Sequence, residues 1–347
     1  MKPEKSHGIS VLIIYTGGTI GMVSHEGSGI LEPVRFDQIL DEVPELHRFG
    51  YNLNSITFDP PIDSSNMTPE IWIKIAKAIQ KNYAYYDGFV ILHGTDTMSY
   101  TASALSYMFK NLDKPIILTG SQLPVGTLRT DGKENLITAI EIAAAKRNGK
   151  AVVPEVCIYF DSKLFRGNRT TKRDSENFRA FVSENYPPLA VAGVDIRYYT
   201  EFIHYPVEQG NLKVFTSFDT NVVILKIFPG INKIVFDAIF DIPGLKGVIL
   251  ESFGAGNVPT AKWLLNSIKK AIDKNIIILN VTQCQGGRVV MGQYQTSIQL
   301  LNLGVITGKD MTTEAAVTKL MFLLGQSLSE EEIKLHLMKS KRGEISE

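Results

Sequence analysis

Cysteine is scarce in this chain of 347 residues, which contains only Cys157 and Cys284. Two cysteines are too few for a disulfide framework or for a zinc site built from several thiolates. Both lie in or beside apolar stretches, so we expect two buried thiols in the reduced state.

Long hydrophobic runs and an excess of charge of either sign are also lacking. No apolar run approaches the length that crosses a bilayer, and residues 1–15 do not have the pattern of a signal peptide. The 36 basic residues balance the 36 acidic ones, which removes the usual electrostatic attraction to nucleic acids and membranes. We therefore expect a cytoplasmic protein whose partners include neither a nucleic acid nor a membrane.

The residues that are present predict an α/β protein. Apolar residues make up 44% of the sequence, and its length suggests about two domains. Short β-rich runs alternate with amphipathic segments of helix length, and runs such as Ile276–Leu279 are apolar on both faces, as in covered parallel strands. We expect a larger N-terminal domain with a mostly parallel sheet and flanking helices, and a smaller C-terminal α/β domain.

The same alternation indicates the domain boundaries. It weakens after about residue 161 and resumes near Val222. This change predicts an N-terminal domain over 1–196, a linker over 197–219 and a C-terminal domain over 220–347.

Local signals mark the starts of two helices. Thr68-Pro69-Glu70 offers an N-cap followed by proline at the first helical position. Ser329 and Glu332 form a capping-box pattern. The charged segment 339–347 is expected to fray.

A glycine-rich string, Tyr15-Thr16-Gly17-Gly18-Thr19-Ile20-Gly21, directly follows the first apolar run. Ligands of parallel α/β domains bind at the carboxyl ends of strands, and paired glycines let the backbone approach a ligand closely. The string lacks the lysine of a P-loop and the G-x-G-x-x-G spacing, which disfavours a nucleotide site. For the string 15–21, the structural alternative is a tight turn with a threonine N-cap. The segment 22–31 that follows it is suited to a flexible lid.

A second polar string, His93-Gly94-Thr95-Asp96-Thr97, also follows an apolar run. Its carboxylate could hold a substrate ammonium group, or Asp96 or Thr97 could simply cap a helix. We expect His93 to be a packed, hydrogen-bonded histidine rather than a catalyst.

Two further strings offer polar groups. The string from Phe165 to Lys172 is either a surface loop or the source of a lysine base beside Thr95 and Asp96. The hydroxyl and amide groups of Asp63–Thr68 could bind a carboxylate, or the segment could be a turn before a capped helix.

Together these strings resemble the bacterial asparaginase–glutaminase family, and most closely its cytoplasmic type I branch. The resemblance extends over essentially the whole chain. It is carried by the segments 15–22, 63–68, 86–98, 118–124, 166–172 and 282–284. It implies hydrolysis of L-asparagine to L-aspartate and ammonia through a threonine nucleophile and a covalent β-aspartyl intermediate, with no metal or organic cofactor.

The resemblance also implies roles for individual residues. Thr16 would be the nucleophile, and Thr95, Asp96 and Lys172 would complete the catalytic group. Backbone N–H groups near Thr95 would stabilise the oxyanion. The substrate-binding residues implied by the resemblance are Gly17, Asp63, Ser64, Ser65, Gly94, Thr95, Asp96 and Ser121, with Gly120 beside them.

The family completes each active site across a subunit interface. Asn257 matches the residue that reaches into the neighbouring subunit's site. The resemblance therefore implies a homo-oligomer, at least a dimer, with a tetramer as the larger alternative.

The sequence departs from the family pattern in two places. Many relatives carry a tyrosine in the lid, but segment 22–31 has none, and Tyr294 is a candidate substitute. In the regulatory site of some type I enzymes, Thr171 and Cys284 match, but Glu251 replaces an arginine. Losing a carboxylate-binding arginine removes charge-assisted hydrogen bonds, so we expect weak or absent activation by asparagine.

Three alternatives remain beside an asparaginase. One is a glutaminase–asparaginase of broad specificity. Another is the amidotransferase subunit that supplies ammonia for transfer-RNA modification, which usually carries an extra N-terminal domain; a first motif at Tyr15 disfavours it. The third is a non-catalytic binding module, which the four matching catalytic residues disfavour.

Overall fold

The computed structural model describes residues 8–24, 31–33, 38–39, 42–206, 210–292 and 295–346. The chain divides into two compact units, Met1–Thr216 and Ser217–Glu347. Residues 197–216 of the expected linker belong to the first unit. They include η5 (Thr200–Phe202) and β16 (Lys213–Val214), which pairs with β6 (Phe109–Lys110).

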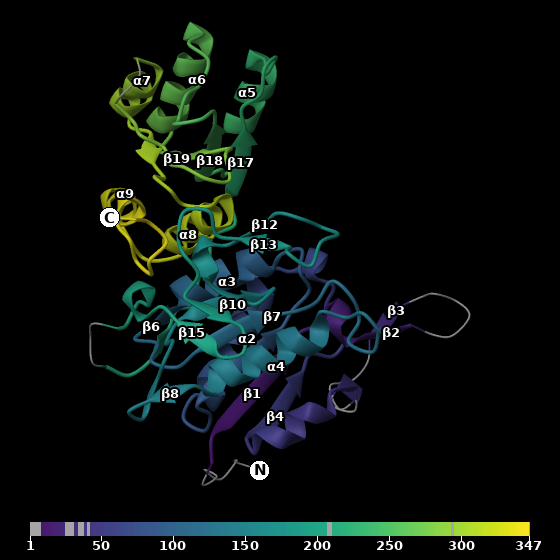
Figure 1. Ribbon diagram of the computed structural model, residues 1–347. Helices are drawn as coiled ribbons and strands as arrows, with labels where there is room; N and C mark the ends of the chain where they lie inside the picture. The colour runs from purple at the N-terminus through teal and green to yellow at the C-terminus, as the bar shows by residue number, and fades with distance from the viewer. Residues whose placement is uncertain are drawn as a thin grey trace. The chain divides into compact units, whose positions relative to one another are not determined.

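The first unit is built on an eight-stranded sheet with the order β15-β14-β11-β10-β7-β5-β1-β4 (Figure 1). The strands are β1 (Ser10–Tyr15), β4 (Asn52–Thr57), β5 (Gly88–Leu92), β7 (Ile116–Thr119), β10 (Val156–Phe160), β11 (Lys163–Arg166), β14 (Ala190–Ala192) and β15 (Ile196–Tyr198). The strands from β4 to β10 in this order are parallel, and β11, β14 and β15 pair antiparallel.

Register places three strand ends together at one edge of this sheet. Tyr15 at the end of β1 pairs with Leu92 at the end of β5, and Leu92 pairs with Thr119 at the end of β7. The residues that follow these ends are Thr16, His93 and Gly120, so the polar strings found in the sequence meet at this edge.

Helices cover both faces of the sheet. Every residue of β1 and β5 is buried, as expected for strands with no solvent-facing side. Helix α4 (Gly132–Ala144) packs on the face that includes Val11 and Ile13. Helices α2 (Pro69–Asn82) and α3 (Met98–Met108) lie on the other face (Figure 1). The predicted parallel α/β architecture is confirmed for this unit.

Short elements complete the first unit. The antiparallel pairs are β2 (Met22–Ser24) with β3 (Leu31–Pro33), β8 (Lys146–Arg147) with β9 (Lys150–Ala151), and β12 (Thr171–Lys172) with β13 (Phe181–Val182). The 3-10 helices are η1 (Thr19–Gly21), η2 (Pro44–Phe49), η3 (Ser64–Asn66) and η4 (Gly167–Arg169). Residues 25–30 of the expected lid lie outside the described residues.

The second unit has its own parallel sheet, in the order β17-β18-β19-β20. Its strands are β17 (Val222–Lys226), β18 (Gly247–Ser252), β19 (Ile277–Thr282) and β20 (Ile306–Thr307). Its helices are α5 (Lys233–Phe240), α6 (Lys262–Asp273), α7 (Gln295–Leu303), α8 (Thr313–Leu324) and α9 (Glu330–Met338). Apolar residues of α5, α6 and α7 form a core with the sheet, and Leu320 of α8 lies against Gly247. The separate C-terminal α/β domain is confirmed.

Several local predictions can be compared with the structure. Ser329 and Glu332 form the predicted capping box of α9, and Thr68 precedes α2 with Pro69 in its first turn. The prediction that the end of the chain frays is wrong for the described residues up to 346. Glu344 is fully buried there, and an ion pair with Lys319 compensates its charge.

The two cysteines differ in exposure. Cys157 is buried in β10, whereas Cys284 is exposed after β19, so the expectation of two buried thiols is wrong for Cys284. The apolar run before Cys284 ends with β19 at Thr282, and the chain then turns toward solvent.

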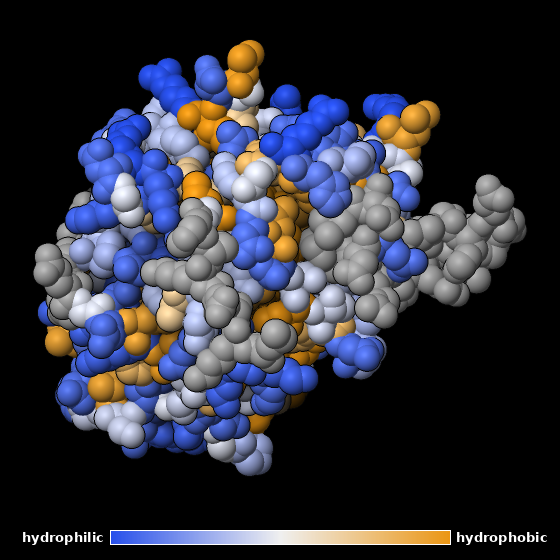
Figure 2. All heavy atoms as spheres, turned by 90° about the horizontal axis from the view of Figure 1, so that it is seen from below, coloured by the Kyte–Doolittle hydropathy of each residue, from blue (hydrophilic) through white to orange (hydrophobic). Residues whose placement is uncertain are grey.

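One face of the molecule shows how polar and apolar side chains are distributed on the surface. Hydrophilic side chains cover most of the face seen in Figure 2, with hydrophobic ones in patches between them. Within the described residues, we find no helix with both the length and the apolar character needed to cross a membrane.

Candidate active site

The site begins at the carboxyl edge of the first unit's sheet. The backbone N–H of Thr16 donates a hydrogen bond to the Leu92 carbonyl (3.0 Å), and that of His93 donates to the Thr119 carbonyl (2.9 Å). These bonds continue the strand pairing beyond β1 and β5, so the loops that follow the strands leave the sheet together.

Two glycines allow these loops to touch. Gly17 and Gly18 have φ values of 130° and 95°, a region that residues with a side chain rarely adopt. A Cβ atom on Gly17 would lie 2.2 Å from the Ile62 carbonyl oxygen, and one on Gly18 would lie 2.5 Å from the Gly94 nitrogen. The glycines therefore bring the first polar string against the segments around Ile62 and Gly94.

Thr16 lies at the centre of this junction and is 1% exposed. Its hydroxyl donates a hydrogen bond to the Leu92 carbonyl (2.9 Å). A hydroxyl carries one proton, so in this conformation Thr16 does not donate to Thr95 or Lys172.

The structure joins Lys172, Thr95 and Asp96, although Lys172 is more than 70 positions away in sequence. Lys172 Nζ lies 2.8 Å from Thr95 Oγ1 and 2.7 Å from Asp96 Oδ1. The lysine side chain is 16% exposed and that of Asp96 is 65% exposed. The cluster thus opens to solvent on the carboxylate side, where a polar ligand could enter.

Neither Asp96 nor Thr97 caps a helix with its side chain, so the helix-cap alternative for the second polar string is wrong. Thr97 holds the N-cap position of α3, but its side chain makes no capping hydrogen bond. Its hydroxyl instead donates to the Ser64 carbonyl (2.7 Å), while Asp96 pairs with Lys172. Both side chains therefore link separate loops rather than satisfying the end of their own helix.

The segment around Ser64 forms another wall. Ser64 is 3% exposed, and a Cβ atom on Gly94 would lie 2.5 Å from its hydroxyl oxygen. Asp63 Oδ1 accepts a hydrogen bond from the Ser65 N–H (2.9 Å) and caps η3. Asp63 and Ser65 are exposed, so only Ser64 is enclosed against the strand ends.

Gln122, which stands out in no polar string of the sequence, also contacts Thr95. The Thr95 hydroxyl donates to Gln122 Oε1 (3.3 Å). The Gln122 N–H lies 3.0 Å from Asp131 Oδ2, and burial raises the pKa of Asp131 above its ordinary range. Gln122 lies in the segment 118–124 that carried the family resemblance, and that was the one signal that could have found it.

The neighbouring Ser121 is directed elsewhere. It is 1% exposed, and its hydroxyl donates to the Leu123 carbonyl (2.5 Å). A Cβ atom on Gly120 would lie 2.3 Å from the His93 carbonyl oxygen, so this loop also packs tightly against the second polar string.

The segment before Lys172 is a buried polar structure. Arg169 is 2% exposed and Asn168 is fully buried. Arg166 Nε lies 2.6 Å from Glu155 Oε2, and the Tyr186 ring faces the guanidinium groups of Arg166 and Arg169. The surface-loop alternative is wrong for this part of the string, because Arg166, Asn168 and Arg169 are buried inside the unit.

His93 is packed, as expected from the sequence. It is 1% exposed. Its Nδ1 lies 2.6 Å from the Gly94 carbonyl oxygen, and its Nε2 lies 2.8 Å from Thr101 Oγ1. Burial lowers the pKa of His93 to about 4, so the imidazole is neutral near pH 7.

The remaining expected site residues lie in the second unit or outside the described residues. Asn257 closes a tight loop, since its N–H donates to the Phe253 carbonyl (2.8 Å) and its carbonyl accepts from the Phe253 N–H (2.9 Å). Tyr294 lies outside the described residues.

The residues of the expected regulatory site are divided between the units. Thr171 lies in β12 of the first unit, whereas Glu251 and Cys284 lie in the second. Glu251 Oε1 accepts a hydrogen bond from the Thr313 hydroxyl (2.6 Å), and Glu251 Oε2 lies 3.8 Å from Lys226 Nζ.

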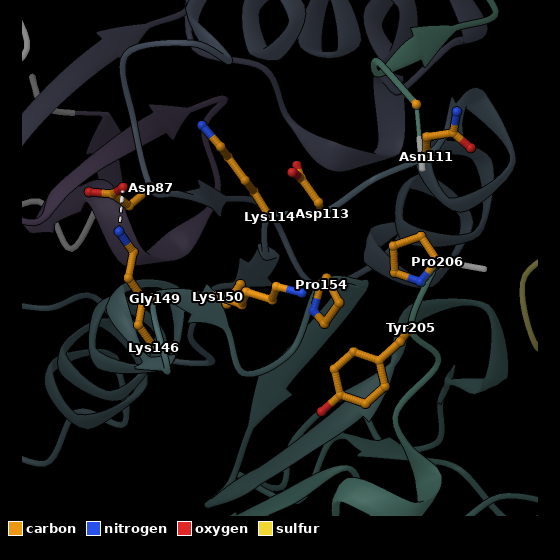
Figure 3. A pocket seen from close by; sticks show the side chains of 12 residues that line it. Asp87, Asn111, Asp113, Lys114, Lys146, Gly149, Lys150, Pro154, Tyr205 and Pro206 are labelled. Carbon is orange, nitrogen blue, oxygen red and sulfur yellow. Dashed lines mark hydrogen bonds and ion pairs between the residues drawn. The ribbon is translucent and has the colours of Figure 1, made fainter. Parts of the chain in front are cut away.

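A cavity of about 600 Å³ lies on the opposite edge of the first sheet (Figure 3). Asp87, Lys114 and Pro154 line it just before β5, β7 and β10, so it is at the amino ends of these strands. Lys146 pairs with Asp87 at 2.7 Å, and Lys114 donates to the Tyr86 carbonyl at 2.6 Å. None of the expected site residues lines this cavity.

Metal ligands do not gather at either edge. Within the described part of the chain, no group of three or more histidine, cysteine, aspartate or glutamate residues is arranged to hold a metal ion. The polar groups that the described residues bring to the carboxyl edge are hydroxyl groups, one lysine side chain and carboxylates.

Comparisons with known proteins assign the chain to a family. The model of the asparaginase N-terminal domain matches residues 10–204, and that of the glutaminase/asparaginase C-terminal domain matches residues 221–337. L-asparaginase 1 of Escherichia coli strain K12 is 44% identical over 340 residues, covering 97% of this chain and 98% of that protein.

Two other relatives extend the comparison. The 60 kDa lysophospholipase of Mus musculus is 40% identical over 370 residues, covering all of this chain and 63% of that protein. The crystal structure of L-asparaginase I from Vibrio cholerae superposes with a TM-score of 0.88 at 42% identity, covering 98% of this chain and 99% of that one. This chain belongs to the asparaginase family.

Proposed function

We propose that this protein hydrolyses L-asparagine to L-aspartate and ammonia through a covalent β-aspartyl intermediate on Thr16. The observation that carries the proposal is the hydrogen-bonded cluster of Lys172, Thr95 and Asp96. It lies at the strand edge that also positions Thr16. The E. coli and V. cholerae relatives, both named L-asparaginases, support asparagine as the substrate.

In the first half-reaction, the Thr16 oxygen attacks the carbon of the substrate's side-chain amide. The Thr16 proton must leave, because a neutral hydroxyl is a weak nucleophile. Rotation of the hydroxyl away from the Leu92 carbonyl would release that proton for transfer. When the C–N bond breaks, the nitrogen takes up a proton and departs as ammonia.

Thr95 and Lys172 are proposed to move the proton. The Thr95 oxygen accepts from Lys172 Nζ and its hydroxyl donates to Gln122 Oε1. A deprotonated Lys172 could take the Thr95 proton while Thr95 takes that of Thr16, by way of a water in one half-reaction. In the second half-reaction, water attacks the ester carbon, which releases aspartate and restores the Thr16 hydroxyl.

The α-amino and α-carboxylate groups of asparagine need opposite partners. Asp96 is proposed to bind the α-ammonium group, since its carboxylate is the exposed side of the cluster. The Ser64 hydroxyl is proposed to bind the α-carboxylate, with Ser65 and Asp63 beside it. Gly17, Gly94 and Ser121 would line the rest of the pocket.

The proposed enzyme is a homo-oligomer, at least a dimer, in which Asn257 completes the neighbouring subunit's site. Its support is the match of Asn257 to the family pattern, together with its position in a loop closed by two backbone hydrogen bonds to Phe253. A cytoplasmic location, a tetramer and a role of Tyr294 in place of the lid tyrosine stay predictions.

The test is product release by the purified full chain. We expect ammonia and aspartate from L-asparagine, less product from L-glutamine, and no ammonia from the Thr16→Ala variant. Fatty-acid release from lysophosphatidylcholine should be measured in parallel, because the mouse relative is named a lysophospholipase. Absence of ammonia from asparagine at any concentration up to millimolar would overturn the proposal.

A further inference from the structure

His93 is a buried side chain that the proposed reaction leaves without a role. It lies between Leu92, the last residue of β5, and the Gly94-Thr95 segment of the site. Its two ring nitrogens contact different partners, one in the site loop and one in α3. These partners determine which nitrogen carries the proton.

The Nδ1 contact requires a proton on Nδ1. Its partner, 2.6 Å away, is the carbonyl oxygen of Gly94, and a carbonyl oxygen can only accept. Nδ1 must therefore be the donor.

The Nε2 contact completes a series of hydrogen bonds that all run in one direction. Thr101 Oγ1 lies 2.8 Å from Nε2 and accepts a hydrogen bond from Trp72 Nε1 (3.1 Å). With the imidazole neutral, Nε2 accepts the Thr101 proton. The donors then run from Trp72 to Thr101 to His93 and finally to the Gly94 carbonyl. All three side chains are at least 94% buried, so water does not compete with these bonds.

The last bond of this series orients a peptide plane. The Gly94 carbonyl and the Thr95 N–H belong to the same peptide, which is trans, since Asp59–Pro60 is the one cis bond in the described residues. In a trans peptide the C=O and N–H groups point in opposite directions. Among the described residues, no acceptor for the Thr95 N–H is present, so this donor is available to a ligand.

We infer that His93 is a positioning residue that holds the Gly94–Thr95 peptide so that the Thr95 N–H faces the oxyanion of the proposed reaction. The inference rests on the proposed function. The packing of Gly94 against Ser64 ties the same peptide to the proposed carboxylate-binding residue. A donor fixed before the reaction stabilises the developing charge without reorganisation.

The experiment alters Thr101, which lies in α3 and holds the His93 ring at Nε2. Thr101→Val removes the hydroxyl with little change of shape, and Thr101→Ser is the matched control that keeps it. In Thr101→Val, Nε2 has no hydrogen-bond partner in α3, so the His93 ring loses one of the two bonds that fix its orientation. The ring can then turn, which weakens the Nδ1–H bond to the Gly94 carbonyl, frees the peptide and no longer confines the proton to Nδ1.

We expect kcat of Thr101→Val for asparagine to fall about tenfold or more, with KM changed less than about threefold and Thr101→Ser close to wild type. A general loss of folded protein would lower the measured kcat without moving the tautomer. Nitrogen-15 NMR of histidine-labelled protein supplies that second readout. The six histidines give few signals, and we expect His93 protonated on Nδ1 in the wild type and in Thr101→Ser.

Two results would overturn the inference: equal kcat for Thr101→Val and Thr101→Ser, or a wild-type His93 protonated on Nε2. The NMR measurement needs no substrate, so it also tests the tautomer if Thr101→Val does not fold. A wild type that releases no ammonia would overturn the proposed function instead, and the tautomer result would still stand.

Discussion

The ammonium group of Lys172 lies 2.8 Å from the hydroxyl oxygen of Thr95, a residue 77 positions earlier in the chain. The lysine reaches this position from β12, which follows the buried arginine-rich turn of η4. The contact places the Lys172 nitrogen at the Thr95 hydroxyl, where a deprotonated lysine is proposed to take the Thr95 proton as Thr95 takes that of Thr16.

This contact predicts a difference between two substitutions of Thr95. Thr95→Val should lower kcat for asparagine by about 10²-fold or more, in the range of a lost general acid–base step. Thr95→Ser, the matched control, keeps the hydroxyl and should retain most of the activity. Steady-state ammonia release measures both. Comparable kcat values for the two variants would contradict the proton-transfer role of Thr95.

The burial of His93 predicts a loss of stability in acid. Folding lowers the pKa of His93 to about 4, while the unfolded chain has the ordinary value near 6.5. Between these values the unfolded state binds a proton that the folded state does not, so stability falls as the pH falls through this range. Each pKa unit corresponds to about 1.4 kcal/mol, which gives a loss of about 3 kcal/mol from His93.

Urea unfolding from pH 7 to pH 4 measures this effect. The His93→Gln variant should lose about 3 kcal/mol less than the wild type over the same range, because glutamine does not titrate. The other five histidines are present in both proteins and cancel in the comparison. Parallel stability curves for the two proteins would show that folding does not lower the pKa of His93.

The α/β architecture and the cluster of Thr95, Asp96 and Lys172 could both be predicted from the sequence, but for different reasons. Strands buried on both faces read as continuous apolar runs, which identified β1, β5 and β19. Thr95, Asp96 and Lys172 were found through short motifs that resemble a family. Their residue types alone left a helix cap and a surface loop open, and it took the three-dimensional contacts to exclude those alternatives.

Other features depend on contacts that leave no periodic pattern. Gln122 is one polar residue among several in its segment, and its contact with Thr95 follows from the pairing of β5 and β7. The charged composition of 339–347 is typical of a frayed end, but one buried partner, Lys319, overrides it. A short stretch of sequence cannot show that Lys319 and Glu344 contact each other in the folded protein.

The Lys319–Glu344 pair predicts a large cost for removing one charge. Both side chains are fully buried and 2.6 Å apart, and an unpaired buried charge costs about 3–5 kcal/mol. Glu344→Gln should therefore lower the free energy of unfolding of the second unit by that amount in urea denaturation.

An exposed pair in the same unit supplies the control. Glu330 and Lys334 form an ion pair one helical turn apart, with about a third of each side chain exposed. Glu330→Gln should cost less than about 1 kcal/mol, as is usual for surface pairs. Equal losses in Glu344→Gln and Glu330→Gln would contradict the importance of the buried pair.

The contacts of Glu251 predict how the reaction rate depends on asparagine concentration. Its carboxylate already accepts a hydrogen bond from Thr313 and lies near Lys226, and a negative group disfavours a second carboxylate ligand. We expect a Hill coefficient close to one for asparagine. A coefficient clearly above one in steady-state kinetics would contradict weak or absent activation. The Thr313→Val variant, which leaves Glu251 in place, is the matched control and should give the same value.

The proposed contribution of Asn257 to the neighbouring site predicts recovery of activity in mixed oligomers. Thr16→Ala removes the nucleophile of its own site, and Asn257→Ala removes the residue donated to the partner's site. Each variant alone should be nearly inactive. In a mixed dimer of the two, one site combines Thr16 of the Asn257→Ala chain with Asn257 of the Thr16→Ala chain.

The site that combines these two residues is complete, and the other site of the mixed dimer lacks both Thr16 and Asn257. Co-expression with two different affinity tags allows the mixed species to be purified, and we expect it to show about half the wild-type kcat per dimer. Mixing the separately purified variants without subunit exchange is the control and should show no recovery. If Asn257 acted within its own subunit, neither site of the mixed dimer would be complete, because each chain would still lack one essential group, and the mixed species would stay as inactive as its parents.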